Sequence, residues 1–200
     1  MREKTIKKMI TSMAIVFSLF MSVNSLKAQQ VALKTNLLYD ATTTFNLGME
    51  FSLAPKWTLD ISANYNPWTF DDNKKIKHLM LQPEARYWFC QKMNGHFLGM
   101  HLHGGIYNVG NIDTSMDWLG TNFGVLKDNR LEGWFAGAGI GYGYAWMLGK
   151  HWNLEAEIAI GYVYTKYEQY PCVKCSEKES DRVHNYVGPT KAALSLVYVF

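Results

Sequence analysis

Two histidines separated by one residue are the first feature of this chain that could do chemistry. Alternate side chains of a β-strand point to the same side, so His101 and His103 would present two imidazoles on one face. That spacing can hold a metal ion, and Glu84 would be a third ligand if its strand aligned with theirs. We favour the competing interpretation, in which both imidazoles belong to a hydrogen-bonded polar network and the chain holds no metal or other cofactor.

A pair of cysteines near the C-terminal end, Cys172 and Cys175, is separated by two residues. In an exported protein, the first interpretation of such a pair is a local disulfide. A zinc site that also uses His184 is the alternative. The third cysteine, Cys90, is expected at the opposite end of the fold. No thioredoxin-like βαβ pattern surrounds the pair, so we expect no redox active site.

Glycines recur at odd-numbered positions between residues 133 and 143. A dinucleotide-binding loop needs the spacing G-x-G-x-x-G, and Tyr142 occupies the third glycine position after Gly137 and Gly139. The period of two instead predicts a strand whose glycine face lies against crowded neighbours. The apolar faces carry no paired serine and histidine, so we expect no catalysis. A lipid-modifying outer-membrane enzyme remains an alternative.

The elements that must position these residues are β-strands. Residues 152–164 alternate strictly, with Trp152, Ile158 and Tyr164 among the apolar side chains of one face. Similar alternation predicts eight strands, over residues 31–40, 43–53, 57–65, 78–90, 96–109, 134–148, 152–164 and 191–200. No stretch has the pattern of an amphipathic helix.

The segments between these strands alternate in length. Short turns at residues 54–56, 91–95 and 148–150 alternate with long polar segments at 67–77, 110–129 and 168–185. This arrangement is typical of outer-membrane proteins, which have tight periplasmic turns and long external loops. Strands of roughly 11 residues, tilted by about 40°, would rise roughly 27 Å, close to the apolar band of such barrels. We therefore predict an all-β fold, an eight-stranded antiparallel transmembrane β-barrel (OmpA/OmpX-like) with both termini in the periplasm.

The more polar face of each strand carries the glycines, which leave room in a narrow interior, so we assign that face to the lumen. The predicted lumen network comprises Lys34, Glu50, Asp60, Glu84, Arg86, His101, His103, Glu155, Glu157 and Lys191, with Asn36 beside it. Five carboxylates and three fixed cations must pair or meet water, and we expect them to plug the barrel. A small pore is one alternative, and a soluble periplasmic ligand-binding barrel with its apolar face inside is another.

Large aromatic residues on the apolar face cluster at the ends of the predicted strands. Two membrane-interface girdles are expected, one of Trp57, Trp146, Trp152 and Phe200, and the other of Tyr39, Tyr65, Trp134 and Tyr164.

Residues 1–28 have the plan of a cleaved secretory signal peptide, with a basic start, an apolar run over residues 9–23 and Ala28 before the cut. An uncleaved anchor is the alternative. The whole chain has a net charge of +3, but residues 1–28 hold five basic residues and one acidic residue. The remaining domain, residues 29–200, has 15 basic and 16 acidic residues, a net charge of −1. This balance gives no reason to expect a nucleic-acid partner.

Five short stretches carry a resemblance to a known family. They are KTNLLYD (34–40), QPEARYW (82–88), GHFLG (95–99), GYGY (141–144) and GPTK (188–191). Together they resemble an uncharacterised family of small outer-membrane β-barrel proteins from Bacteroides-type bacteria, a domain of unknown function often encoded near fimbrillin genes. The resemblance implies an outer-membrane location, contact with membrane lipid, and an accessory role with surface-fibre or envelope proteins as partners. It supplies no catalytic residues.

Overall fold

Eight antiparallel strands close into a ring in the computed structural model, which describes residues 30–70, 74–112, 117–118, 121–122, 127, 129–170 and 180–200. The ring is closed by β1, whose Lys34 is paired with Val197 of the last strand on one side and with Gly48 of the second on the other. This confirms the predicted all-β class and the eight antiparallel strands. The strands are β1 Val31–Asn36, β2 Phe45–Ala54, β3 Trp57–Asn66, β4 Lys75–Trp88, β5 Gly95–Gly110, β8 Arg130–Met147, β9 Trp152–Tyr170 and β10 Ser180–Val199.

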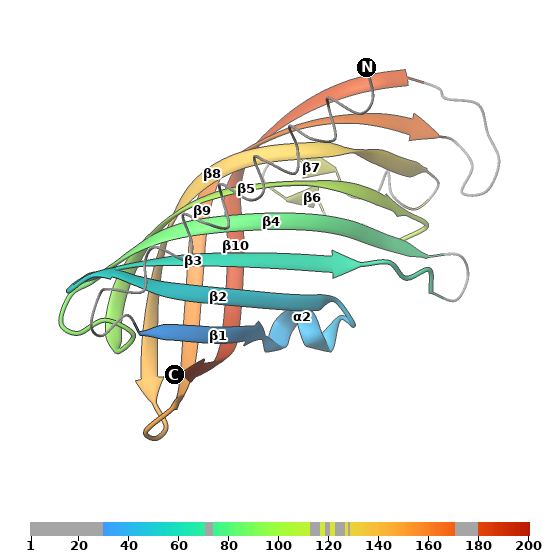
Figure 1. Cartoon of the computed structure of the whole chain (residues 1–200). Helices are drawn as coiled ribbons and strands as arrows, with labels where there is room; N and C mark the ends of the chain where they lie inside the picture. The colour runs from blue at the N-terminus through green and yellow to red at the C-terminus, as the bar shows by residue number, and fades with distance from the viewer. Residues whose placement is uncertain are drawn as a thin grey trace, which may run out of the picture.

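The ring has two unlike ends. At one end the strands are joined by short turns, and Phe200 donates a backbone hydrogen bond of 2.9 Å to Val31, so the last strand finishes beside the start of the first. At the other end the strands differ in length, from 6 residues in β1 to 20 in β10. Figure 1 shows β4, β5, β8 and β9 reaching beyond the ends of β1 and β2. A short hairpin of β6 (Asp117–Trp118) and β7 (Thr121–Asn122) also belongs to the long segment between β5 and β8.

Alternate residues of each strand face opposite sides of the ring. Outward side chains are apolar and exposed, as for Leu102 (62%) and Ile140 (63%). Inward side chains are polar and buried, as for Glu50 and Arg86, each 1% exposed. The ring thus has a polar interior and an apolar exterior, the reverse of an ordinary water-soluble barrel.

A small apolar cluster closes the interior near the short-turn end. The rings of Trp88 and Phe97 lie 4.7 Å apart, and both side chains are fully buried. Ala32, Ala145 and Val197 complete the layer from three other strands. In the part of the chain that the structure describes, no helix has the length and apolar character needed to cross a membrane.

The prediction of a strand over residues 31–40 is wrong for its second half. Asn36 ends β1 and caps a single helical turn, α2 (Leu37–Ala41), because its side-chain oxygen accepts a hydrogen bond of 3.1 Å from the backbone of Leu38. The turn carries Tyr39 inward, where it lines the same small cavity as Lys34 and Lys191. The assignment of Tyr39 to an outer aromatic girdle is therefore wrong.

The long segment predicted over residues 168–185 is also shorter than expected. Strand β9 continues to Tyr170, and β10 begins at Ser180. Here Glu168 and Asp181 are paired on the outward face, so the apolar alternation that marks a strand in the sequence is lost although the backbone ladder continues. A register shift between Pro189 and Lys191 also exchanges the odd and even positions of β10, which breaks its period.

Candidate functional site

Arg86 lies at the centre of the polar interior and contacts all five carboxylates predicted for the lumen. Its Nε lies 2.5 Å from Glu84, and one terminal nitrogen, Nη1, lies 3.1 Å from Glu50 and 2.8 Å from Glu155. The other, Nη2, lies 3.0 Å from Asp60 and 2.8 Å from Glu157. A planar guanidinium with five N–H groups suits this position, because it can serve several carboxylates at once.

The strand register explains why the cations are needed. Glu50, Asp60 and Glu84 are direct cross-strand partners on β2, β3 and β4. Like charges in such positions repel one another, more strongly in a buried site than at a surface. Arg86 lies on β4 two residues from Glu84 and points to the same face of that strand. Its side chain therefore reaches into the row of carboxylates.

Two lysines complete the ion pairs from β1 and β10. Lys34 contacts Glu50, lies 3.2 Å from Asp60 and 3.1 Å from Glu155. Lys191 lies 2.7 Å from Glu84 and 2.9 Å from Glu157. The structure thus brings eight of the ten predicted lumen residues into one cluster, hereafter the lumen cluster: Lys34, Glu50, Asp60, Glu84, Arg86, Glu155, Glu157 and Lys191.

The lumen cluster leaves little open space. The cavity that runs past Lys34, Arg86 and Lys191 has a volume of about 30 Å³, room for only about two or three water molecules. One oxygen each of Asp60 and Glu157 is buried without a hydrogen-bond partner among the described residues. The cluster therefore fills this level of the interior almost completely.

The two histidines lie next to the lumen cluster, on β5. Their rings are 5.3 Å apart, and Nε2 of His101 is 3.1 Å from the hydroxyl of Thr190. Nδ1 of His101 lies 3.8 Å from Glu84, whose carboxylate is already bonded to Arg86 and Lys191. Among the described residues, no group of three or more His, Cys, Asp or Glu side chains could hold a metal ion.

The odd-numbered glycines of β8 face these inward side chains. A Cβ atom on Gly139 would lie 2.7 Å from the ring of His101, and one on Gly141 would lie 2.8 Å from Glu157. At Gly139 the Cβ atom would also lie 2.6 Å from the backbone oxygen of Ile160, so a larger residue does not fit there, whereas at Gly141 the flexible Glu157 side chain would have to move. The glycine face thus gives the lumen its space.

Several inward residues of the site were not identified from the sequence. Thr58 donates its hydroxyl to Glu50 and accepts a hydrogen bond of 2.9 Å from the indole of Trp88. Both residues stand at the alternate positions of their strands that face inward, and this alternation could have identified them from the sequence. Asn36, expected beside the lumen network, lines the small cavity that Lys34 and Lys191 also line. Its side-chain oxygen accepts hydrogen bonds from the backbone N–H groups of Leu38 and Leu194.

Cys172 and Cys175 lie outside the described residues. Cys90 follows β4 at the short-turn end, where it is exposed and has no disulfide partner within the described part of the chain.

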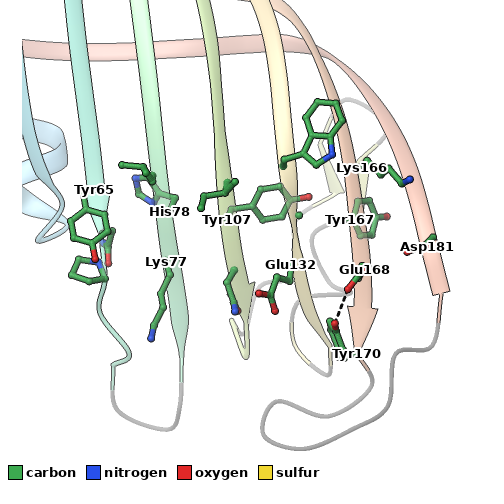
Figure 2. Close-up of a pocket in the computed structure, with 17 residues that line it drawn as sticks. Tyr65, Lys77, His78, Tyr107, Glu132, Lys166, Tyr167, Glu168, Tyr170 and Asp181 are labelled. Carbon is green, nitrogen blue, oxygen red and sulfur yellow. Dashed lines mark hydrogen bonds between the residues drawn. The ribbon is translucent and has the colours of Figure 1, made fainter. Parts of the chain in front are cut away.

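A second feature, a groove of about 720 Å³, lies at the end of the ring opposite the short turns (Figure 2). The strand register defines two rows of outward residues that line it. The inner row is Tyr65, Leu79, Ile106, Trp134 and Lys166, and the rim row is Lys77, Asn108, Glu132, Glu168 and Asp181. Figure 2 shows Lys77, Glu132 and Glu168 at a similar height on β4, β8 and β9.

Tyr170 lies at the end of this groove. Its hydroxyl donates a hydrogen bond of 2.7 Å to Glu168, and this bond raises the pKa of the hydroxyl. The guanidinium of Arg130 stacks 4.4 Å above the Tyr170 ring and lies 3.7 Å from Glu132. The groove therefore combines aromatic rings with charged and amide groups, some of which donate hydrogen bonds and some of which accept them.

The chain matches a known protein family. The family described as "Protein of unknown function (DUF3575)" matches residues 13–200. No curated protein matches the chain.

Proposed function

The chain belongs to the DUF3575 family, and we propose that it is an outer-membrane β-barrel protein with a structural or surface-assembly role and no catalytic activity. Residues 1–28 act as a cleaved signal peptide for export, and residues 29–200 form the barrel. The short turns face the periplasm, and the ends of the long strands face outward from the cell.

The observation that carries this proposal is the apolar exterior of a closed ring with a charged interior. Leu102, Ile140, Ile158 and Ile160 lie on neighbouring strands, and more than 60% of each side chain is exposed. A continuous apolar surface of this kind is unfavourable in water and favourable in lipid. The closed ring also leaves no unpaired strand edge at this level, as a lipid environment requires.

Outward aromatic residues near both ends of the ring support a membrane position. Near the short turns, Trp152, Tyr198 and Phe200 form a chain of edge-to-face contacts with ring centroids 5.0 Å apart. Near the other end, the rings of Trp134 and Tyr164 lie 5.6 Å apart. Amphipathic rings prefer the two interfaces between lipid and water.

The filled interior favours a structural role over a pore. Arg86 and its partners occupy the cross-section, and the cavity beside them has room for only about two or three water molecules. The long strands on one side offer a surface beyond the membrane, which suits an accessory of surface-fibre assembly, as the sequence resemblance implies. Envelope proteins and outer-membrane lipid are the partners that this role requires.

Cell fractionation tests the proposal. The protein should pellet with outer membranes, require detergent for extraction, and run as a compact band on gels unless it is heated. Protease added to intact cells should cut within residues 111–129 or 171–179, which lie between the strands, whereas the short turn at residues 148–151 should be protected until the cells are opened. Recovery in the soluble periplasmic fraction would overturn the proposal.

A further inference from the structure

We propose that the groove in Figure 2 binds the saccharide of a glycolipid in the outer leaflet, with an acyl chain of the same lipid lying along the strands below it. This inference rests on the proposed membrane location and adds a ligand class and a binding site to it.

The chemistry of the groove fits a neutral, hydroxylated ligand. Lys77, Lys166 and the neighbouring Arg130 offset the carboxylates of Glu132, Glu168 and Asp181. The lining is therefore close to neutral and attracts neither anions nor cations strongly. Carboxylate oxygens accept hydrogen bonds from hydroxyl groups, whereas lysine and asparagine side chains donate hydrogen bonds to them.

The inner row supplies the apolar contacts that a sugar ring needs. Tyr65 and Trp134 are half-exposed on the outward face of β3 and β8, with Leu79 and Ile106 paired between them. The electron-rich face of an aromatic ring packs against the C–H groups of a sugar, while the polar groups one row away bind its hydroxyls.

A second groove identifies the ligand as a lipid rather than a free saccharide. It has a volume of about 700 Å³ and is lined by outward side chains of the same strands, including Leu102, Ala138 and Tyr162. Ala138 is paired with Leu102 on β5 and Tyr162 on β9, so a small side chain between two large ones creates the depression.

The two grooves are arranged in the order in which a glycolipid would present its parts. On β5, β8 and β9 the lining of the second groove lies four residues from that of the first: Leu102 and Ile106, Ala138 and Trp134, Tyr162 and Lys166. Four residues of strand span about 13 Å. An acyl chain along the apolar groove would therefore place its headgroup at the aromatic and polar rows.

The test uses the full-length mature chain in nanodiscs of phosphatidylethanolamine containing a minor fraction of digalactosyldiacylglycerol. Native mass spectrometry after release from the disc counts the lipids that stay bound. The wild-type protein should retain the glycolipid in preference to phosphatidylethanolamine. Trp134→Leu, which removes the ring, and Ala138→Leu, which fills the lower groove, should each reduce that preference by about fivefold.

Trp146→Leu is the matched control, because Trp146 lies on the same strand, faces outward, and is as exposed as Trp134, at 45% each. It lies at the short-turn end, outside both grooves, so its variant should bind the glycolipid like the wild type. A protein that enters the discs without preferring the glycolipid, or an equal loss in Trp146→Leu, overturns the glycolipid site alone. A chain that does not enter the discs overturns the membrane assignment and the glycolipid site together.

Discussion

Lys191 donates a hydrogen bond to Glu84 across the full width of the ring, with 2.7 Å between Nζ and Oε2. Their strands, β10 and β4, are four places apart in either direction around eight strands, so they lie directly opposite one another. An interaction that spans the ring ties its two halves together independently of the backbone ladder. It also leaves little open path along the barrel axis at this level.

Arg86→Met should destabilise the barrel strongly, by about 3–5 kcal/mol, because five buried carboxylates would retain only two lysines as partners. The temperature at which the compact gel band is lost measures this effect. Lys166→Met is the control, since it removes an exposed cation outside the lumen cluster. If both variants keep the wild-type transition, Arg86 does not hold the interior together.

Two neighbouring carboxylates of β9 should differ in their response to neutralisation. Both oxygens of Glu155 contact Lys34, and Oε1 also contacts Arg86. Glu157 uses only Oε2, which contacts Arg86 and Lys191, whereas Oε1 has no hydrogen-bond partner among the described residues.

Because the lumen cluster holds five carboxylates and three cations, loss of the less well bonded charge also relieves repulsion. Glu157→Gln should therefore cost less than about 1 kcal/mol, and Glu155→Gln about 2–4 kcal/mol. Urea unfolding in lipid vesicles measures both values. A larger loss for Glu157→Gln would contradict this account of the cluster.

The strands within the predicted membrane band could be derived from the sequence because a single physical rule governs them. Leu102 is apolar and lies on the outer face of the ring, and His101 is polar and lies on the inner face, so the alternation of the two faces is visible residue by residue. The same rule places Glu84, Arg86 and Glu157 on the inner face of their strands.

The rest of the fold depends on contacts that alternation does not encode. Asn36 ends β1 by capping the backbone of Leu38, a local competition between strand and helix that gives no periodic signal. Beyond the apolar band, the paired outward residues Glu168 and Asp181 are polar. The extension of β9 and β10 therefore shows no alternation of apolar and polar residues in the sequence. The groove was missed for the same reason, because its rows are defined by register between distant strands.

Gly139→Leu should disrupt folding, because its new side chain would collide with the ring of His101 and the backbone of Ile160. Such overpacking costs about 1–3 kcal/mol or more in a filled interior. Ala138→Leu places the same side chain one residue away on the outward face, and its unfolding should match the wild type. Equal unfolding curves for the two variants would show that the glycine face does not border the lumen contents.

Planar lipid bilayers containing the purified protein should show no stepwise ion conductance, since the cavity beside Arg86 has a volume of only about 30 Å³. The double variant Arg86→Ala and Glu84→Ala removes two large side chains from the same strand and should open a measurable leak if it folds. Steady conductance steps from the wild-type protein would favour a pore.

A double-mutant cycle tests whether the contact between Lys191 and Glu84 couples the two halves of the ring. Lys191→Met and Glu84→Gln each remove one partner with little change in volume, and the double variant removes both. The interaction free energy should be about 1–3 kcal/mol, because the pair is bonded directly and buried. A control cycle replaces Glu84→Gln with Glu50→Gln, since Glu50 contacts Lys34 and Arg86 in the same interior. Its interaction with Lys191 should be clearly smaller than that of Glu84, because Glu50 belongs to the same network but makes no direct contact with Lys191. Similar values in both cycles would mean that Lys191 senses only the total charge of the lumen cluster, and that the cross-barrel bond adds nothing of its own.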